Sequence, residues 1–135
     1  MDVIQLIGRI LFSYLFITAG IGHLTATANM AGYAASRGLP NAKLAVQTSG
    51  VALIAGGASI LLGLWGDLGA IGLAALLVIL AVAMHAFWKE TDAMAKMTET
   101  VAFNKDLALA GGALAWFFLY HYDVLEWTIT GPLFN

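Results

Sequence analysis

The chain has 135 residues, of which 61% are hydrophobic and only 10% are charged, and its formal net charge is −2. An average soluble domain carries roughly 25% charged residues. The composition therefore excludes an ordinary soluble domain and indicates an integral membrane protein, and the slightly acidic charge argues against a nucleic-acid-binding surface. Because the chain contains no cysteine, thiolate zinc sites, cysteine-ligated iron–sulfur clusters and dithiol chemistry are excluded as well.

Four apolar segments are long enough to cross a bilayer as helices, which takes about 20 residues each. In chain order they cover residues 3–24, 43–65, 67–88 and 103–122. Only Gly66 separates the second span from the third, so these two are expected to form an antiparallel hairpin. We predict a single all-α domain over residues 1–135, a transmembrane four-helix bundle with short interfacial helices in its longer connections.

The first span contains one internal charge, Arg9, about two turns from its start. A charged side chain within the membrane is costly and usually has a partner. Asp67, His121 and Asp123 are expected on the same side of the membrane, so Arg9 is a candidate for a structural ion pair with one of them. A snorkelling anchor and an anion-binding residue are the alternatives.

The two longer connections are expected to lie on the same side of the membrane. Connection 25–42 predicts a short amphipathic helix with Tyr33 toward lipid and Arg37 toward water. Connection 89–102 alternates charged and apolar residues, which suits a second interfacial helix or a solvated linker. Five basic residues fall on this side against Arg9 alone on the other, so both termini are predicted to be exterior. The five are Arg37, Lys43, Lys89, Lys96 and Lys105.

Small residues recur at four-residue spacing in three of the spans. Such stripes allow helix backbones to approach closely inside a membrane, where hydrophobic burial does not drive association. They predict a tightly packed bundle. The pairs are Ala52 with Gly56, Ser59 with Gly63, Ala70 with Ala74, Ala108 with Gly112, and Gly111 with Ala115.

Six polar or amphipathic side chains, drawn from all four spans, are expected at one cytoplasmic depth. They are His23, Gln47, His85, Trp88, Lys105 and Asp106. Histidine donates hydrogen bonds to quinone carbonyls, and lysine or aspartate relays protons, so this set predicts a head-group pocket for a quinone or another small oxidisable ligand. The alternative is an interfacial belt, with Lys105 snorkelling and Asp106 capping the start of its helix.

Haem and metal sites are weaker interpretations of the same histidines. His23 and His85 at similar depth permit a haem between the first and third spans, but two lone histidines make no haem motif. A metal at His85 with Glu90 or Asp92 has no better support, and no metal site is predicted. The sequence contains no complete catalytic set, so catalytic residues stay unassigned.

Four stretches together resemble the DoxX family of membrane proteins. The first span, "RILFSYLFITAGIGHL", resembles the family's opening signature. "AGGASILLG" (55–63), "HAFW" (85–88) and "FNKDLALAGGAL" (103–114) follow in the family's order, so that the resemblance covers about residues 6–120. The family commonly has lysine where His23 stands. It often has a glutamate in the second span, where this chain has only apolar residues at 51–55, which weakens a carboxylate-based mechanism.

The resemblance implies a multi-pass, four-helix protein of the bacterial cytoplasmic membrane. Relatives are linked to thiosulfate:quinone oxidoreductase, through the similar DoxD subunit, and to membrane complexes that act against oxidative stress beside superoxide dismutase and a sulfurtransferase. It implies a redox subunit with protein partners, for which independent enzymatic activity is left open. A noncatalytic accessory subunit is the alternative. A small-solute carrier is less favoured, because no span is broken by proline.

Overall fold

The computed structural model describes residues 2–134, and this part of the chain is all α. It contains no β-strand. Five α-helices and one short 3₁₀-helix, η1, follow one another along the chain. Their bounds are α1 Asp2–Thr25, α2 Thr27–Ser36, α3 Ala42–Leu62, α4 Gly66–Met84, η1 Phe87–Lys89 and α5 Ala93–His121.

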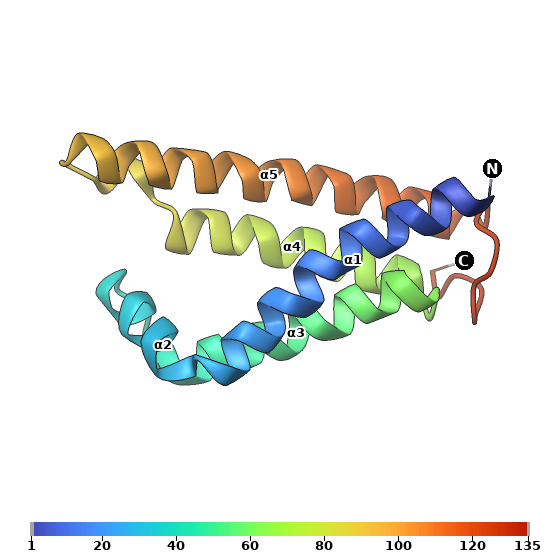
Figure 1. Ribbon diagram of the computed structural model, residues 1–135, viewed down its shortest axis with the longest axis horizontal. Coiled ribbons are helices and arrows are strands. Elements are labelled where there is room, and N and C mark those ends of the chain that lie inside the picture. The colour runs from blue at the N-terminus through green and yellow to red at the C-terminus, as the bar shows by residue number, and fades with distance from the viewer. Residues whose placement is uncertain (1, 135) are drawn as a thin grey trace.

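The long helices form two pairs that share a central contact. α1 packs along α3, α5 packs along α4, and α3 contacts α4. α2 packs on α3 at the end of the molecule that also holds the start of α5 (Figure 1). The described chain ends and the α3–α4 turn gather at the opposite end, which we call the terminal end (Figure 1).

Three helical segments within residues 2–134 are long and apolar enough to cross a membrane. They are Asp2–Thr25, Ala42–Leu62 and Gly66–Lys89. The prediction of an all-α membrane protein is therefore confirmed. α5 does not meet the same criterion, because Lys105 and Asp106 lie in its apolar part. The fourth span, and with it the transmembrane four-helix bundle, stays a prediction.

Glycines allow the helices to approach closely along α3. A Cβ atom at Gly20 of α1 would lie 2.5 Å from the carbonyl oxygen of Gly50, and one at Gly56 would lie 2.5 Å from the side chain of Leu73 in α4. Gly56 belongs to a predicted small-residue stripe. The small residues of α5 divide between two faces. A Cβ atom at Gly112 would lie 3.2 Å from Phe12 of α1, whereas one at Gly111 would meet nothing within 4 Å, and Ala108 is exposed. Small residues thus allow α3 to approach its neighbours, while Gly111 and Ala108 leave one face of α5 open.

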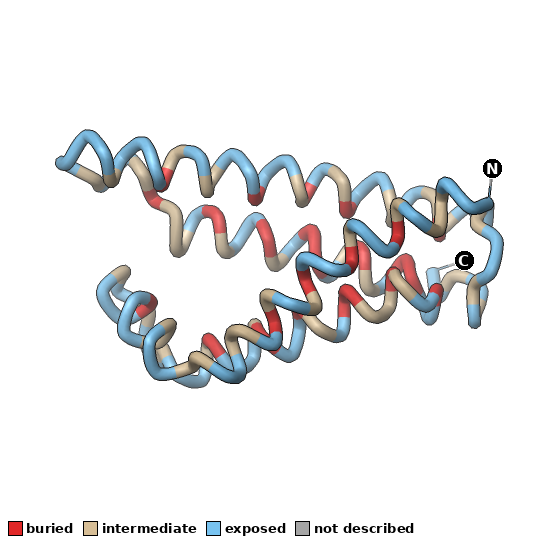
Figure 2. Tube along the Cα trace, viewed as in Figure 1, coloured by how far each residue is buried: buried red, intermediate tan, exposed pale blue. Residues whose placement is uncertain are grey.

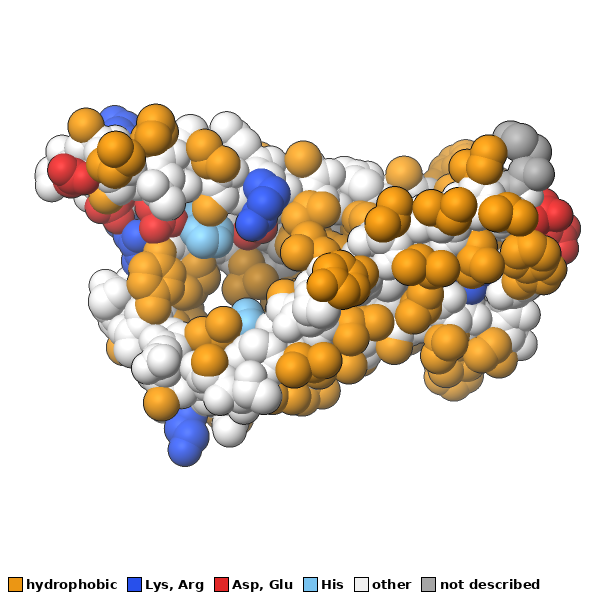
Figure 3. All heavy atoms as spheres, viewed as in Figure 1, with side chains coloured by type: hydrophobic (Ala, Val, Ile, Leu, Met, Phe, Trp, Pro, Cys, Tyr) orange, Lys and Arg blue, Asp and Glu red, His pale blue; other side chains and the backbone are white. Residues whose placement is uncertain are grey.

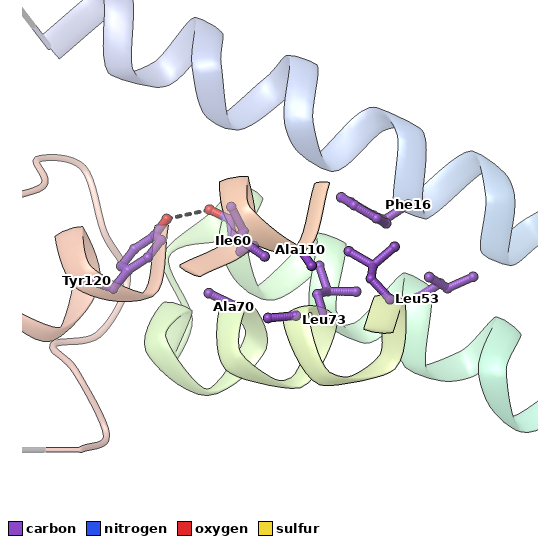
Figure 4. Packing of buried hydrophobic residues seen from close by; sticks show 10 residues of the cluster. Phe16, Leu53, Ile60, Ala70, Leu73, Ala110 and Tyr120 are labelled. Carbon is purple, nitrogen blue, oxygen red and sulfur yellow. Dashed lines mark hydrogen bonds between the residues drawn. The ribbon is translucent and has the colours of Figure 1, made fainter. Parts of the chain in front are cut away.

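The core lies where the two helix pairs meet. Buried positions face the centre of the bundle, and exposed positions cover the outside (Figure 2). Phe16 of α1, Leu53 of α3, Leu73 of α4 and Ala110 of α5 belong to one buried cluster (Figure 4). Large apolar side chains also cover the outer surface. That distribution is expected for helices whose outer solvent is lipid, not water.

The α3–α4 turn lies at residues 63–65, before the predicted join at Gly66. Gly63 adopts φ 62° and ends α3, and its amide donates to the Ser59 carbonyl. A left-handed glycine is the common way to end a helix, because it avoids a Cβ clash. Gly66 is instead the first residue of α4, where its missing side chain leaves room for the Tyr120 ring.

α5 begins ten residues before the predicted span. Connection 89–102 is therefore neither a linker nor a separate interfacial helix, since its second half is the start of α5. The Asp92 carboxylate accepts a hydrogen bond from the Ala95 amide at 2.9 Å and caps this helix. Asp106 lies more than three turns further along, so the alternative that it caps its helix is wrong.

Arg9 is bound by backbone carbonyls at the terminal end. Its side chain donates to Ile60 O at 3.1 Å and Leu61 O at 2.7 Å, in the last turn of α3. It also donates to Glu126 O and Trp127 O, both at 3.1 Å. Because the last carbonyls of a helix have no partner within the helix, Arg9 joins α1, α3 and the C-terminal segment.

The predicted ion pair of Arg9 is thus replaced by these carbonyl contacts, and its suggested partners are occupied elsewhere. The Asp67 carboxylate accepts hydrogen bonds from the amides of Leu133 at 3.0 Å and Phe134 at 2.7 Å. His121 stacks on an aromatic ring of its own helix, and Asp123 is exposed. The segment after α5 therefore folds back across the terminal end of the bundle.

Candidate functional site

A cavity of about 970 Å³ lies at the end of the bundle opposite the terminal end. Its walls are mostly apolar and come from α1, α2, α3, α4 and α5. The hollow opens on the face drawn in Figure 3, where histidine, acidic and basic side chains gather beside it. Pockets for small molecules typically have volumes of about 300–1,000 Å³, apolar walls and a few polar groups. The cavity has these properties.

Four of the six predicted site residues line the cavity. They are His23 of α1, His85 at the end of α4, and Lys105 and Asp106 of α5. Gln47 and Trp88 are exposed and lie outside its lining. Trp88 packs edge-on against Phe103, with ring centroids 5.8 Å apart. The four lining residues come from three long helices, so only the tertiary fold brings them together.

His85 lies between two carboxylates of α5. Its Nδ1 is 2.7 Å from Glu99 Oε2, and its Nε2 is 3.6 Å from Asp106 Oδ2. Glu99 and Asp106 are seven residues apart, which places them two turns apart on one helix face. Both carboxylates are largely buried, with 9% and 7% of their residues exposed. The Glu99 contact is within hydrogen-bond distance, whereas the Asp106 carboxylate lies slightly further from the ring.

α2 closes one side of the cavity through a group of polar side chains that we call the clasp: Tyr33, Arg37, Glu90 and Glu99. The Tyr33 hydroxyl and Arg37 Nη2 each donate to Glu99 Oε1 at 2.6 Å. Arg37 Nη1 also pairs with Glu90. The clasp joins α2 to α5 and to the segment just after η1. Since Glu99 also contacts His85, it links the clasp to the cavity.

The clasp perturbs the acidity of its own members. Burial and the hydrogen bond to Glu99 raise the pKa of Tyr33 above its usual value. The hydrogen bonds that Arg37 makes with Tyr33 and Glu90 raise the pKa of its guanidinium. Burial acts to raise the pKa of Glu99, but hydrogen bonds from Tyr33 and His85 and the charge of Arg37 outweigh it and lower that pKa. Glu99 is therefore anionic, and its charge keeps the clasp closed.

The sequence analysis placed Tyr33 toward lipid and Arg37 toward water. In the structure the polar groups of both side chains bind carboxylates of the protein, while Tyr33 is still 40% exposed. The Arg37 guanidinium pairs with Glu90 and Glu99, and the Tyr33 hydroxyl donates to Glu99. Both side chains therefore point toward α5. Arg37 also lies over the Tyr33 ring, 5.1 Å from its centroid. The contacts with two carboxylates and an aromatic face offset the free-energy cost of removing the guanidinium from water.

His23 makes a separate polar contact in the cavity wall. Its Nδ1 is 2.9 Å from the Ser49 hydroxyl, which itself donates to the Val46 carbonyl at 2.9 Å. A hydroxyl has only one proton to give. With that hydroxyl proton on the Val46 carbonyl, we assign Nδ1 of His23 as the donor in this pair and Nε2 as an acceptor on a residue that lines the cavity.

The observed contacts argue against the haem interpretation. Nδ1 of His85 is bound to Glu99 and its Nε2 faces Asp106 at 3.6 Å, so the carboxylates of α5 occupy the space next to both ring nitrogens of His85. Among residues 2–134, no three metal-ligating side chains of His, Cys, Asp or Glu converge closely enough to hold an ion. The polar groups instead suit hydrogen bonds and proton exchange.

Sequence analysis missed Glu99, Tyr33 and Ser49 as site residues. A signal was present for Glu99, because it precedes Asp106 by seven residues and so shares its helix face. That signal was hidden by the assumption that the helix begins at residue 103. Tyr33 and Arg37 also share one helix face, because they are four residues apart on α2. Nothing in the sequence alone pairs Ser49 with His23.

Comparison with known proteins gives one match. A family model described as DoxX matches residues 4–86, which include α1 to α4. The stretch at residues 103–114, also taken as similar to the family, lies outside the matched range. No curated protein and no solved structure matches the chain. Since the match covers well over half of its residues, the chain is a membrane protein that belongs to the DoxX family.

Proposed function

We propose that the protein is a subunit of a membrane redox complex and binds a quinone, or another small oxidisable ligand, in its cavity. The observation that carries this proposal is the apolar cavity of about 970 Å³ with His23, His85, Lys105 and Asp106 in its lining. Apolar walls suit the ring of such a ligand, and the polar side chains suit its oxygen atoms. The class of ligand agrees with the family resemblance.

The polar groups have complementary roles in this proposal. Lys105 is exposed and donates to a carbonyl oxygen of the oxidised ligand. Nε2 of His23 accepts from a hydroxyl of the reduced ligand. Reduction of a quinone to a quinol takes up two electrons and two protons. A partner protein supplies the two electrons. Lys105 supplies one proton, and the His85 imidazole, held between Glu99 and Asp106, supplies the other through Asp106.

The membrane orientation belongs to the same proposal. The cavity end faces the bacterial cytoplasm, because five basic residues lie in or beside the connections there and only Arg9 lies toward the terminal end. α5 then crosses the membrane from about Phe103 to its end, as a fourth span. Its two charged residues lie at the cavity, where a polar function explains why they interrupt an otherwise apolar segment.

A noncatalytic accessory subunit is the second candidate. The open small-residue face of α5 supports it, since a Cβ atom at Gly111 would meet nothing within 4 Å and Ala108 and Ala115 are exposed. Such a face suits close contact with a helix of a larger complex. Co-purification of a partner in fixed stoichiometry, with an empty cavity, is the result that favours this function over ligand binding.

Quinone binding is the direct test. The protein is purified in detergent with native lipids, extracts are analysed for quinone, and decylbenzoquinone is titrated into the delipidated protein. Lys105→Ala and His23→Ala each remove one hydrogen bond to the head of the ligand and are expected to weaken binding by about tenfold. Gln47→Ala, a variant outside the cavity lining, serves as the matched control and keeps the wild-type affinity. The proposal fails if no quinone binds, or if both cavity variants bind as the wild type does.

A further inference from the structure

Two sides of the cavity differ in chemistry, and this difference bears on how a ligand reaches it; exposed residues of α3 and α4 line a further side. On one side the clasp joins α2 to α5 by ion pairs and hydrogen bonds. On the other side α1 and α5 face one another across the hollow. This comparison rests on the proposed function, since it concerns the ligand of that same cavity.

α1 and α5 touch near the terminal end and separate toward the cavity. The rings of Phe12 and Trp116 lie 6.2 Å apart, and a Cβ atom at Gly112 would lie 3.2 Å from Phe12. Further along, α1 runs away from α5 toward α2 (Figure 1). There Ala19 of α1 and Leu109 of α5 line the cavity. An opening is thus left between the two helices, and it is visible as the hollow in Figure 3.

Apolar surface adjoins this opening toward the terminal end, and the exposed Lys105 lines the cavity on α5. Leu15 of α1, in the cavity lining, is 39% exposed, and Leu11 of α1 and Leu114 of α5, nearer the terminal end, are 69% and 49% exposed. Side chains of this kind at such exposure face the acyl chains of lipid in a membrane protein. A ligand that passes between Ala19 and Leu109 therefore moves from lipid into an apolar cavity and breaks no polar contact on the way.

The clasp side presents a different barrier. A ligand that enters there has to separate Arg37 from Glu90 and Glu99, and Tyr33 from Glu99. Separating charges with limited access to water is strongly unfavourable. Since Arg37 also has two carboxylate partners, the loss of one contact leaves the other in place.

We propose that the ligand is a membrane-dissolved amphiphile that enters laterally between α1 and α5. Its polar head reaches His85, Lys105 and Asp106, while its apolar chain extends back through the opening into the bilayer. The clasp stays closed and separates the cavity from water during this exchange. A water-soluble ligand of the same head chemistry is not the natural occupant, because it gains nothing from the lipid-facing opening.

The first test maps the chain of the ligand and needs no variant. Wild-type protein in phosphatidylcholine–phosphatidylglycerol vesicles is loaded with a benzoquinone whose decyl chain ends in a diazirine, then irradiated and analysed by peptide mass spectrometry. Label on the α1 and α5 residues that flank the opening supports lateral entry. Label on Tyr33, Arg37 or Glu90 overturns it, although the cavity would still be occupied. Absence of saturable label anywhere contradicts the proposed function itself, and the route with it.

The second test measures the association rate of decylbenzoquinone with variants that narrow the opening. Ala19→Trp and Leu109→Trp are expected to slow association by about tenfold, within the range by which single changes alter association rates. The neighbouring residues Thr18 and Ala108 are exposed and lie outside the lining. Thr18→Trp and Ala108→Trp therefore serve as matched controls and are expected to leave the association rate unchanged. Circular dichroism and thermal unfolding verify that each variant folds.

Opening the clasp completes the comparison. Arg37→Gln removes both ion pairs of α2, and lateral entry predicts an unchanged association rate for decylbenzoquinone. A rate raised about tenfold in Arg37→Gln, with Ala19→Trp and Leu109→Trp equal to their controls, overturns the inference. Benzoquinone without a chain is expected to bind at least about tenfold more weakly, because it lacks the apolar chain that concentrates the ligand in the bilayer. Equal binding by the two quinones also overturns it.

Discussion

The two ends of the molecule handle buried charge in different ways. At the terminal end, charged side chains bind backbone groups: Arg9 binds four carbonyls, and Asp67 binds the amides of the last residues described. At the cavity end, charged side chains bind one another, as in the clasp and around His85. The terminal end is closed by the chain itself, whereas the cavity end keeps open space beside its charges.

This difference separates a structural role from a chemical one. Backbone partners are fixed by the fold and cannot change protonation at ordinary pH, so Arg9 and Asp67 act as permanent links. Side-chain partners such as His85 and Glu99 gain and lose protons and move by rotation about single bonds. Groups of the second kind suit ligand binding. The following variants test the contrast, from the largest expected effect on stability to the smallest.

Arg9→Met is expected to have the largest effect, a loss of about 3 kcal/mol in the free energy of unfolding. The variant removes the charged donor of four carbonyls at a residue that is 1% exposed, and only Ile60 O keeps a close side-chain donor, the Tyr120 hydroxyl. Hydrogen bonds to charged groups are worth roughly 1.5–3 kcal/mol each. Unfolding in detergent, followed by circular dichroism, measures the loss. Arg9→Lys should recover only part of it, because an ammonium group cannot reach all four oxygens. Unchanged stability of Arg9→Met contradicts the structural role.

Asp67→Asn is expected to cost about 2 kcal/mol, since the amide keeps one acceptor oxygen and loses the charge. The effect should be local to the C-terminal segment. Hydrogen exchange measures it directly: the amides of Leu133 and Phe134 become less protected, while those of α3 do not. Asp123→Asn, at an exposed position, serves as the control. Equal protection of both amides in the wild type and in Asp67→Asn shows that the carboxylate does not hold the segment.

Glu99→Gln is expected to destabilise the protein by only about 1 kcal/mol, between the values typical of exposed and fully buried ion pairs. The effect is smaller because Arg37 keeps Glu90 and His85 keeps Asp106. Because the pKa of Glu99 is lowered on folding, its contribution is present above the ordinary value of 4.5 and is lost as the pH falls through the lowered value.

The pH dependence provides the measurement for Glu99. Thermal unfolding of the wild type and of Glu99→Gln should differ at neutral pH and should converge as the pH falls below 4.5. Glu126→Gln removes an exposed carboxylate at the terminal end and is the charge-matched control. A difference that persists in acid shows that Glu99 stabilises the fold through its shape rather than its charge.

Ser49→Ala is expected to have the smallest effect, below about 1 kcal/mol, since it removes one neutral hydrogen bond in the cavity wall. The variant is also expected to change the tautomer of His23, because the ring loses the Ser49 acceptor that holds its proton on Nδ1. Nitrogen NMR of the labelled histidine reports that change. Thr48→Ala is the neighbouring control, because its hydroxyl bonds only carbonyls of its own helix. An unchanged tautomer in Ser49→Ala contradicts the assigned hydrogen bond.

Much of the architecture was predictable because it depends on local composition and spacing. Long apolar segments identified the helices, and Ala55–Gly63 contained the glycine that meets α4. Boundaries were less predictable: the polar stretch before Phe103 read as a connection, although Asp92 caps a helix that continues through it. The error placed Asp106 at a helix start and hid Glu99, whose partners lie at distant positions in the sequence.

The amino-acid sequence by itself determined that this chain prefers lipid, that it forms long helices, and that its charges concentrate near one end. Those properties follow from transfer free energies and helix periodicity, which act residue by residue. Only the tertiary structure decided that Arg9 binds carbonyls, that His85 lies between Glu99 and Asp106, and that Gln47 and Trp88 lie outside the cavity. Each of these depends on how helices rotate and cross, which is set by contacts between residues far apart in the chain.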